Sequence, residues 1–137
     1  MSETKVDIKS YGDVVAARQA GRELAQALGF GAADQTRLAT AISELTTNVI
    51  RYAGEGVCTV VDESNERWRR ISVLVEDNGP GISDVDEAMT QGFSTGKSLG
   101  AGLPGTRRLV DEFTIESEPG RTRVAIAMIR PRRQGAS

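Results

Sequence analysis

The chain has no histidine among its 137 residues and only one cysteine. Without histidine it cannot form a Ser-His-Asp or Cys-His nucleophile pair, use a histidine general base, or hold zinc through histidine. Acid–base chemistry therefore falls to carboxylates or lysine, and a bound metal is expected to be a hard ion held by oxygen. Cys58 lies in the apolar run GVCTVV and is expected to be a buried strand thiol without a disulfide.

A charge excess and long apolar runs are also missing. The net charge is −2, so no general field attracts nucleic acid or anionic lipid, and we expect neither nucleic acid nor membrane as a partner. No apolar run reaches the length that spans a membrane, and the first residues contain no apolar signal segment. A cytoplasmic location is therefore expected. The length favours a single domain over residues 1–137, with a flexible basic tail at 131–137.

Hydrophobic periodicity predicts two long helices near the start of the chain. They are expected over residues 13–29 and 33–54, with Asp34 as the cap of the second helix and Gly29 and Gly54 as the stops. The apolar stripe of the second helix is expected to be buried and consists of Leu38, Ala41, Ile42, Leu45 and Val49.

The remaining elements are mostly strands, and these occur in adjacent pairs. Strands are expected over 5–10, 56–64, 69–77, 113–118 and 122–129, and shorter helices over 84–91 and 103–113. Neighbouring strand pairs predict an α+β fold, a two-layer sandwich in which a mixed, mostly antiparallel sheet carries helices on one face.

A glycine-rich stretch, GFSTGKSLGAGLPG at residues 92–105, contains GKS and suggests phosphate binding. It is not a P-loop, because the pattern G-x-x-x-x-G-K-[ST] needs one more residue between the glycines and a buried strand before them. Gly100 and Gly102 stand just before a predicted helix, where free N–H groups and the helix dipole suit a phosphate. Residues 92–99 would then form a lid; an unliganded flexible loop is the alternative.

Two other groups of residues carry oxygen atoms that can bind or react. Glu44 and Asn48 are four residues apart and share one side of the second helix, although a solvated polar face is the alternative. Asp77 ends an apolar strand and precedes the turn NGPG, in which Gly79 and Gly81 also suit an ordinary tight turn. An aspartate at that place can accept a hydrogen bond from an exocyclic amine, while glycines let the backbone approach a flat ring.

The order E-x-x-x-N, D-x-G-x-G and G-x-G-L before a helix resembles the GHKL ATPase superfamily. This superfamily includes histidine kinase ATP-binding domains, gyrase, Hsp90, MutL and the small anti-sigma serine kinases. The likeness covers nearly the whole chain, and the phrases DNGPGI, GFSTGKSLGAGLPG and RLVDEF are most similar to the RsbT-type stressosome switch kinases. The resemblance implies a Bergerat-type fold with an ATP lid, and ATP and Mg²⁺ as cofactors.

The resemblance also implies roles for single residues. Asn48 is expected to ligate Mg²⁺, and Glu44 to orient or deprotonate the attacking hydroxyl. Asp77 is expected to read the adenine, with Gly79 and Gly81 beneath the base.

Further contacts are expected from the C-terminal half. By the same resemblance Gly100, Gly102 and Leu103 wrap the phosphates, and Thr122 lies near adenine and reaches it through water. An arginine interrupts the Gly-Thr pair that the family has before this threonine. Lys97 is expected to touch a phosphate from its chemistry alone.

The implied function is that of a serine/threonine protein kinase. It would transfer the γ-phosphate of ATP to STAS-domain scaffold and antagonist proteins, which frees the kinase to bind and activate a downstream phosphatase. The alternative is an anti-sigma factor that sequesters a sigma factor in a nucleotide-dependent way, since both would share one ATP site. A free ATPase is a third alternative, which leaves the missing dimerisation and transducer segments of gyrase-like relatives unexplained.

Overall fold

The computed structural model describes residues 3–79 and 102–132. Along the chain the elements are β1 (Glu3–Ile8), α1 (Tyr11–Ala27), α2 (Ala32–Tyr52), β2 (Gly56–Asp62), β3 (Trp68–Asp77), α4 (Gly102–Leu109), β4 (Glu112–Glu118) and β5 (Arg121–Pro131). The helix expected at 84–91 and the lid expected at 92–99 lie outside the described residues.

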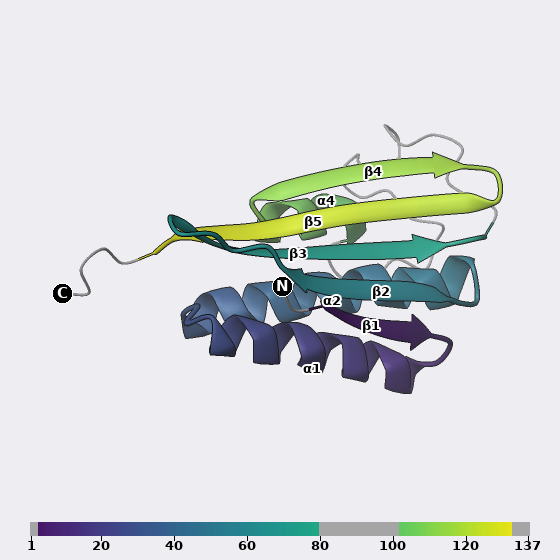
Figure 1. Cartoon of the computed structure of the whole chain (residues 1–137). Helices are drawn as coiled ribbons and strands as arrows, with labels where there is room; N and C mark the ends of the chain where they lie inside the picture. The colour runs from purple at the N-terminus through teal and green to yellow at the C-terminus, as the bar shows by residue number, and fades with distance from the viewer. Residues whose placement is uncertain (1–2, 80–101, 133–137) are drawn as a thin grey trace.

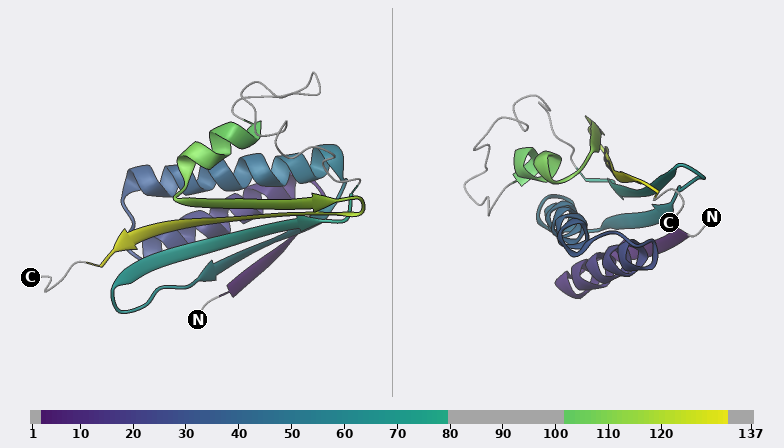
Figure 2. Two further views of the ribbon diagram at one scale, coloured as in Figure 1. Left: turned by 90° about the horizontal axis from the view of Figure 1, so that it is seen from above. Right: turned by 90° about the vertical axis from the view of Figure 1, so that its left-hand side faces the viewer.

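The described strands form one sheet in the order β1-β2-β3-β5-β4, and each neighbouring pair is antiparallel. The helices lie on one face of the sheet, with α2 between α1 and α4 (Figures 1 and 2). This is the two-layer α+β sandwich that the paired strands predicted. The sequence predicted a mixed, mostly antiparallel sheet. In the part of the chain that the structure describes, every strand pair is antiparallel.

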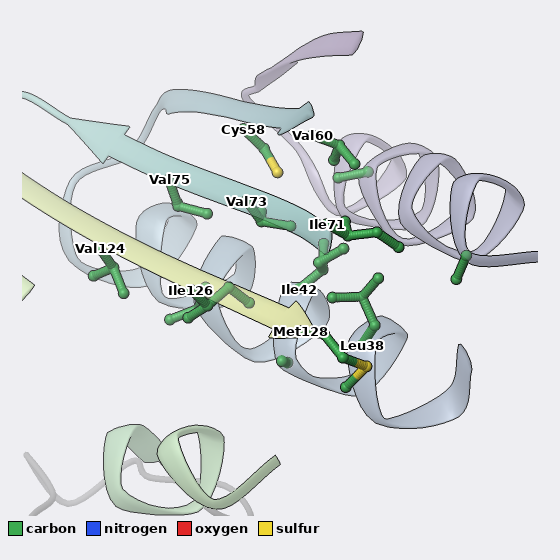
Figure 3. Close-up of a cluster of buried hydrophobic side chains, with 14 of the residues drawn as sticks. Leu38, Ile42, Cys58, Val60, Ile71, Val73, Val75, Val124, Ile126 and Met128 are labelled. Carbon is green, nitrogen blue, oxygen red and sulfur yellow. The ribbon is translucent and has the colours of Figure 1, made fainter. Parts of the chain in front are cut away.

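The hydrophobic core lies between the helices and the sheet (Figure 3). Side chains alternate along a strand, so every second residue of β3 points inward, and Ile71, Val73 and Val75 are buried. Burial also raises the pKa of the Cys58 thiol to about 12, as expected of an inert strand cysteine. The predicted stripe of α2 is buried in full and consists of Leu38, Ala41, Ile42, Leu45 and Val49.

α1 and α2 pack closely because small residues line the α1 side of their contact. A Cβ at Gly21 would lie only 2.3 Å from Cδ1 of Ile42, so the missing side chain lets the helices approach. Both helices end at the predicted glycines, Gly29 and Gly54, which have φ of 82° and 92°. These left-handed conformations are easily adopted by glycine and mark the end of a helix.

The start of α2 differs from the prediction. Asp34 is not the cap; Gly31 occupies the cap position and the helix begins at Ala32. Asp34 instead accepts hydrogen bonds from Nε and Nη2 of Arg130 in β5, at 2.8 and 2.9 Å. Arg130 also donates to Asp111 at 2.8 Å. The capping prediction was wrong because this carboxylate is engaged by an arginine from a distant strand, which fastens the helix layer to the sheet.

The C-terminal elements differ in length from those predicted. α4 ends before the predicted limit, because Glu112 already pairs within the sheet as the first residue of β4. β5 continues to Pro131, and the N–H of Arg132 donates to the carbonyl oxygen of Arg67 at 2.8 Å. The sheet therefore holds the first residues of the expected tail, while 133–137 lie outside the described residues. Among the described helices, none is long and apolar enough to cross a membrane.

Candidate functional site

Asp77 is the last residue of β3, and strand pairing fixes its neighbours across the sheet. It lies opposite Gly56 of β2 on one side and opposite Thr122 of β5 on the other. Thr122 in turn lies opposite Ser117 of β4. Val75 faces the helices, so Asp77, two residues further along the strand, faces the same way. Asp77, Thr122 and Ser117 therefore form a polar row across one end of the sheet, on its helix-covered face.

Gly56 brings α2 close to this row. A Cβ at Gly56 would lie 2.3 Å from the carbonyl oxygen of Glu76, 2.9 Å from Cγ1 of Val49 and 3.2 Å from Cβ of Asp77. A side chain would overlap the first two groups and make a tight contact with the third. The glycine therefore lets the C-terminal half of α2 rest against the strand end that carries Asp77.

Gly79 passes equally close to the end of α2. Its hypothetical Cβ would lie 2.6 Å from Cβ of Ala53, which leaves no space for a side chain. The N–H of Gly79 donates to Oδ1 of Asp77 at 2.9 Å. A carboxylate can accept further hydrogen bonds beyond this one. Burial raises the pKa of Asp77, and the hydrogen bond from Gly79 offsets part of that rise.

Glu44 and Asn48 lie on the flank of α2 that faces away from α1. Ile42 marks the α1 side, because its Cδ1 is the atom nearest to Gly21. Glu44 follows two residues later and Asn48 six, which places both roughly 120–160° around the helix from Ile42 at about 3.6 residues per turn. α4 lies on that other side of α2 (Figure 2). Both residues are half-buried.

The electrostatics of Glu44 suit a base. Desolvation raises the pKa of this carboxyl, and the positive charge of Arg51 opposes the rise. A partly buried carboxylate with a raised pKa beside one specific cation is a candidate functional group rather than an ordinary surface residue. Sequence reasoning missed Arg51, although its spacing from Glu44 and Asn48 places it on the same flank of the helix.

The start of α4 supplies the remaining described part of the predicted site. Gly102 begins the helix, and Leu103 follows in the first turn, half-buried against the core. α4 runs antiparallel to β4, so its N-terminus points toward the sheet end that carries the polar row (Figure 2). The predicted contacts of Gly81, Lys97 and Gly100 lie outside the described residues.

The donor set fits a metal that is shared with a ligand. In the described part of the chain no three carboxylate, cysteine or histidine side chains gather to hold an ion. Asn48 offers one amide oxygen beside the carboxylate of Glu44. Mg²⁺ in nucleotide sites keeps several waters and phosphate oxygens and takes only one or two protein ligands, which this flank of α2 can provide.

Comparison with known sequences identifies relatives over most of the chain. Residues 33–133 match the family described as Histidine kinase-, DNA gyrase B-, and HSP90-like ATPase. The serine/threonine-protein kinase RsbT of Bacillus subtilis is 48% identical over 115 residues, which cover 84% of this chain and 86% of that protein. An anti-sigma F factor of Clostridium kluyveri is 33% identical over 87 residues, 61% of each chain.

Solved structures agree on the fold. The RsbU and RsbW domains of a Mycobacterium tuberculosis protein match 97% of this chain and 34% of that chain, with a TM-score of 0.65 and 18% identity. The catalytic domain of the histidine kinase ThkA matches 93% of this chain and 97% of that chain, with a TM-score of 0.51 and 18% identity. At such low identity the likeness speaks for the fold alone.

Proposed function

The chain belongs to the histidine kinase-, DNA gyrase B- and HSP90-like ATPase family, within its branch of RsbT-type serine/threonine-protein kinases, and we propose that it transfers the γ-phosphate of ATP to partner proteins. The observation that carries the proposal is the meeting of Asp77 with α2 at one end of the sheet, in a chain nearly half identical to a kinase. The predicted acceptor for an amine and the predicted base then lie on two neighbouring elements, β3 and α2.

In this proposal Asp77 accepts a hydrogen bond from the amine of adenine. Its carboxylate is half-buried and already oriented by the N–H of Gly79 at 2.9 Å. Thr122, opposite Asp77 on β5, supplies a hydroxyl beside the purine. Gly79 carries no side chain, so a flat base could approach its backbone closely.

The phosphates would extend from the purine toward the start of α4. N–H groups at Gly102 and Leu103 and the positive end of the helix dipole suit their charge. Asn48 would hold Mg²⁺, which when bound neutralises charge on the phosphates. Gly81, Lys97 and Gly100 remain proposed contacts on the strength of the family resemblance and, for Lys97, of its charge.

Glu44 would act on the attacking hydroxyl. The serine or threonine oxygen forms a bond to the γ-phosphorus, the bond between that phosphorus and the leaving ADP oxygen breaks, and the hydroxyl proton passes to Glu44. A raised pKa brings a carboxylate closer to the range in which a general base works well. No histidine is needed, because phosphoryl transfer depends mainly on positioning and charge stabilisation.

We further propose that the acceptors are STAS-domain scaffold and antagonist proteins. Their phosphorylation would free the kinase to activate a downstream phosphatase. A partner-switching role of this kind is consistent with the relation to RsbT. Sequestration of a sigma factor is the second candidate function, and the likeness to an anti-sigma F factor favours it.

Incubation of the chain with γ-labelled ATP, Mg²⁺ and a STAS-domain protein tests both candidates. Label on a serine or threonine of the STAS protein supports the kinase. Stable, nucleotide-dependent capture of a sigma factor without transfer supports the alternative. Glu44→Ala should keep nucleotide binding and lose transfer, whereas Glu23→Ala on the exposed face of α1 is the matched control and should behave as wild type. Normal transfer by Glu44→Ala would show that Glu44 is not the base.

A further inference from the structure

We infer that Ser117 is a positioning residue of the adenine site: it holds the hydroxyl of Thr122 so that Thr122 donates to a ring nitrogen of the purine. The inference rests on the nucleotide site proposed above and extends it by one strand, from β5 to β4. Neither the family motifs nor local sequence patterns indicate Ser117, because it is brought to the site by the pairing of β4 with β5.

The contact between the two hydroxyls is direct. Oγ of Ser117 and Oγ1 of Thr122 are 2.7 Å apart, the usual separation of an O–H···O hydrogen bond. Thr122 is buried, with 9% of its surface exposed, and Ser117 is half-buried. At such a site the bond restricts the rotation of the threonine hydroxyl, which would otherwise be free to turn.

The direction of this bond determines what Thr122 can offer a ligand. One hydroxyl must donate and the other must accept. When Ser117 donates, the proton of Thr122 is available for an acceptor atom of a ligand. A ring nitrogen of adenine is such an acceptor, whereas the carboxylate of Asp77 can only accept and so takes the amine.

The geometry of the row matches the edge of adenine. Directly opposed residues on antiparallel strands have Cβ atoms about 4.5–5.5 Å apart, which applies to Asp77 and Thr122. In adenine the amine lies between two acceptor nitrogens, N1 and N7. When the amine reaches Asp77, one of these nitrogens comes within reach of Thr122, directly or through a bridging water.

The hairpin that joins β4 to β5 fixes this arrangement. Glu118 and Arg121 are its closing pair, and only Pro119 and Gly120 lie between them. Gly120 has φ of 88°, which lets the chain reverse within so short a turn. Ser117 is therefore held opposite Thr122 by the backbone, independently of any ligand.

Calorimetric titration of the full chain with ADP, 1-deaza-ADP and 7-deaza-ADP in the presence of Mg²⁺ tests the inference. Wild type should prefer ADP to the analogue that lacks the nitrogen read by Thr122. Ser117→Ala should weaken ADP roughly two- to tenfold, the effect of one neutral hydrogen bond, and leave the affinity for that analogue unchanged. Ser117→Thr, which keeps a hydroxyl, should restore the preference.

A double-mutant cycle separates positioning from an independent contact. Thr122→Val should lose the same preference, and adding Ser117→Ala to it should cause no further loss, since the two hydroxyls act as a unit. Thr114→Ala is the matched control, because it removes an exposed hydroxyl from β4, the strand of Ser117. It should leave the affinities for ADP and both deaza analogues unchanged. Ser117→Cys, with a weakly donating thiol, repeats the test if Ser117→Ala does not fold.

An equal loss of affinity for all three nucleotides in Ser117→Ala, no loss at all, or additive losses in the double mutant would overturn the role of Ser117. Asp77→Asn distinguishes this failure from a failure of the site itself. If Asp77→Asn binds ADP as tightly as wild type does, the proposed adenine site is wrong. If Asp77→Asn weakens ADP while Ser117→Ala does not, only the inference about Ser117 fails.

Discussion

Gly56→Ala tests whether the proposed nucleotide site depends on a position that carries no functional group. The added Cβ would lie 2.3 Å from the carbonyl oxygen of Glu76, and real Cβ contacts are essentially never shorter than 3.0 Å. The difference, 3.0 − 2.3 = 0.7 Å, is the least displacement that the substitution demands. The obstructing atom belongs to the backbone of β3, so it cannot turn aside as the end of a flexible side chain would.

The displacement has two expected consequences. Forcing an extra carbon into a closely packed position typically costs about 1–3 kcal/mol of stability. The start of β2 must also move away from β3, and this shifts the neighbours of the new methyl group, Val49 of α2 and Asp77. Because catalytic and binding geometry tolerates only small errors, we expect a clear loss of ADP affinity in addition to the loss of stability.

Urea denaturation and calorimetric titration with ADP measure the two effects in the same preparation. Circular dichroism and the fluorescence of Trp68, the one tryptophan, follow unfolding, and this residue lies at the end of β3 remote from Asp77. Gly12→Ala is the matched control. Its Cβ would meet only Oγ of Ser10 at 3.6 Å, an ordinary contact, so alanine there should leave the stability and the affinity for ADP no lower than in wild type.

The reasoning is refuted if Gly56→Ala matches wild type in both the urea midpoint and the affinity for ADP. A loss of stability with unchanged ADP affinity would show that Gly56 serves packing alone, and that the position of Asp77 does not depend on it.

Three further predictions follow from the charges of the structure. Arg130→Met should lower the unfolding free energy by about 1–3 kcal/mol at pH 7, because it leaves the half-buried Asp34 without its main partner. Arg130 lowers the pKa of Asp34, so this stabilisation is present above the ordinary pKa of aspartate and disappears as the pH falls through the lowered value. The unfolding free energies of wild type and Arg130→Met, measured in urea, should therefore become equal in acid. Asp77→Asn should raise the melting temperature of the nucleotide-free chain at pH 7, because burial raises the pKa of Asp77 and so disfavours its charged form in the fold; a lower melting temperature would contradict this. The rate of phosphoryl transfer should fall as the pH drops through the raised pKa of Glu44, and Glu44→Gln should be slow at every pH in the same assay.

The elements of the fold were predictable because their signals are local. The apolar stripe of α2 and the glycines at 29 and 54 depend on spacing and on backbone conformation, and both are visible in a short window of sequence. Asp34 shows where such reasoning fails. Its local position favours a helix cap, but its partner Arg130 lies on the last strand, and no short window contains both.

The candidate site likewise contains some residues with a local sequence signal and others without one. Glu44, Asn48 and Asp77 stand out by their spacing within one helix or by their place at the end of one strand. Ser117 does not, because its inferred role comes from a register across strands. Gly56 gives no distinct signal either, because it begins β2 and glycine is also common in the turn before a strand.

The short turn at Pro119 and Gly120 limits how the β4–β5 hairpin can change length. Side chains alternate with a period of two, so one inserted or deleted residue that slips the pairing by one position would send Ser117 to the uncovered face of the sheet. Loops elsewhere on a protein surface usually tolerate such changes. If Ser117 acts as inferred, this connection instead belongs functionally to the proposed nucleotide site, although it contains no residue that would touch the nucleotide.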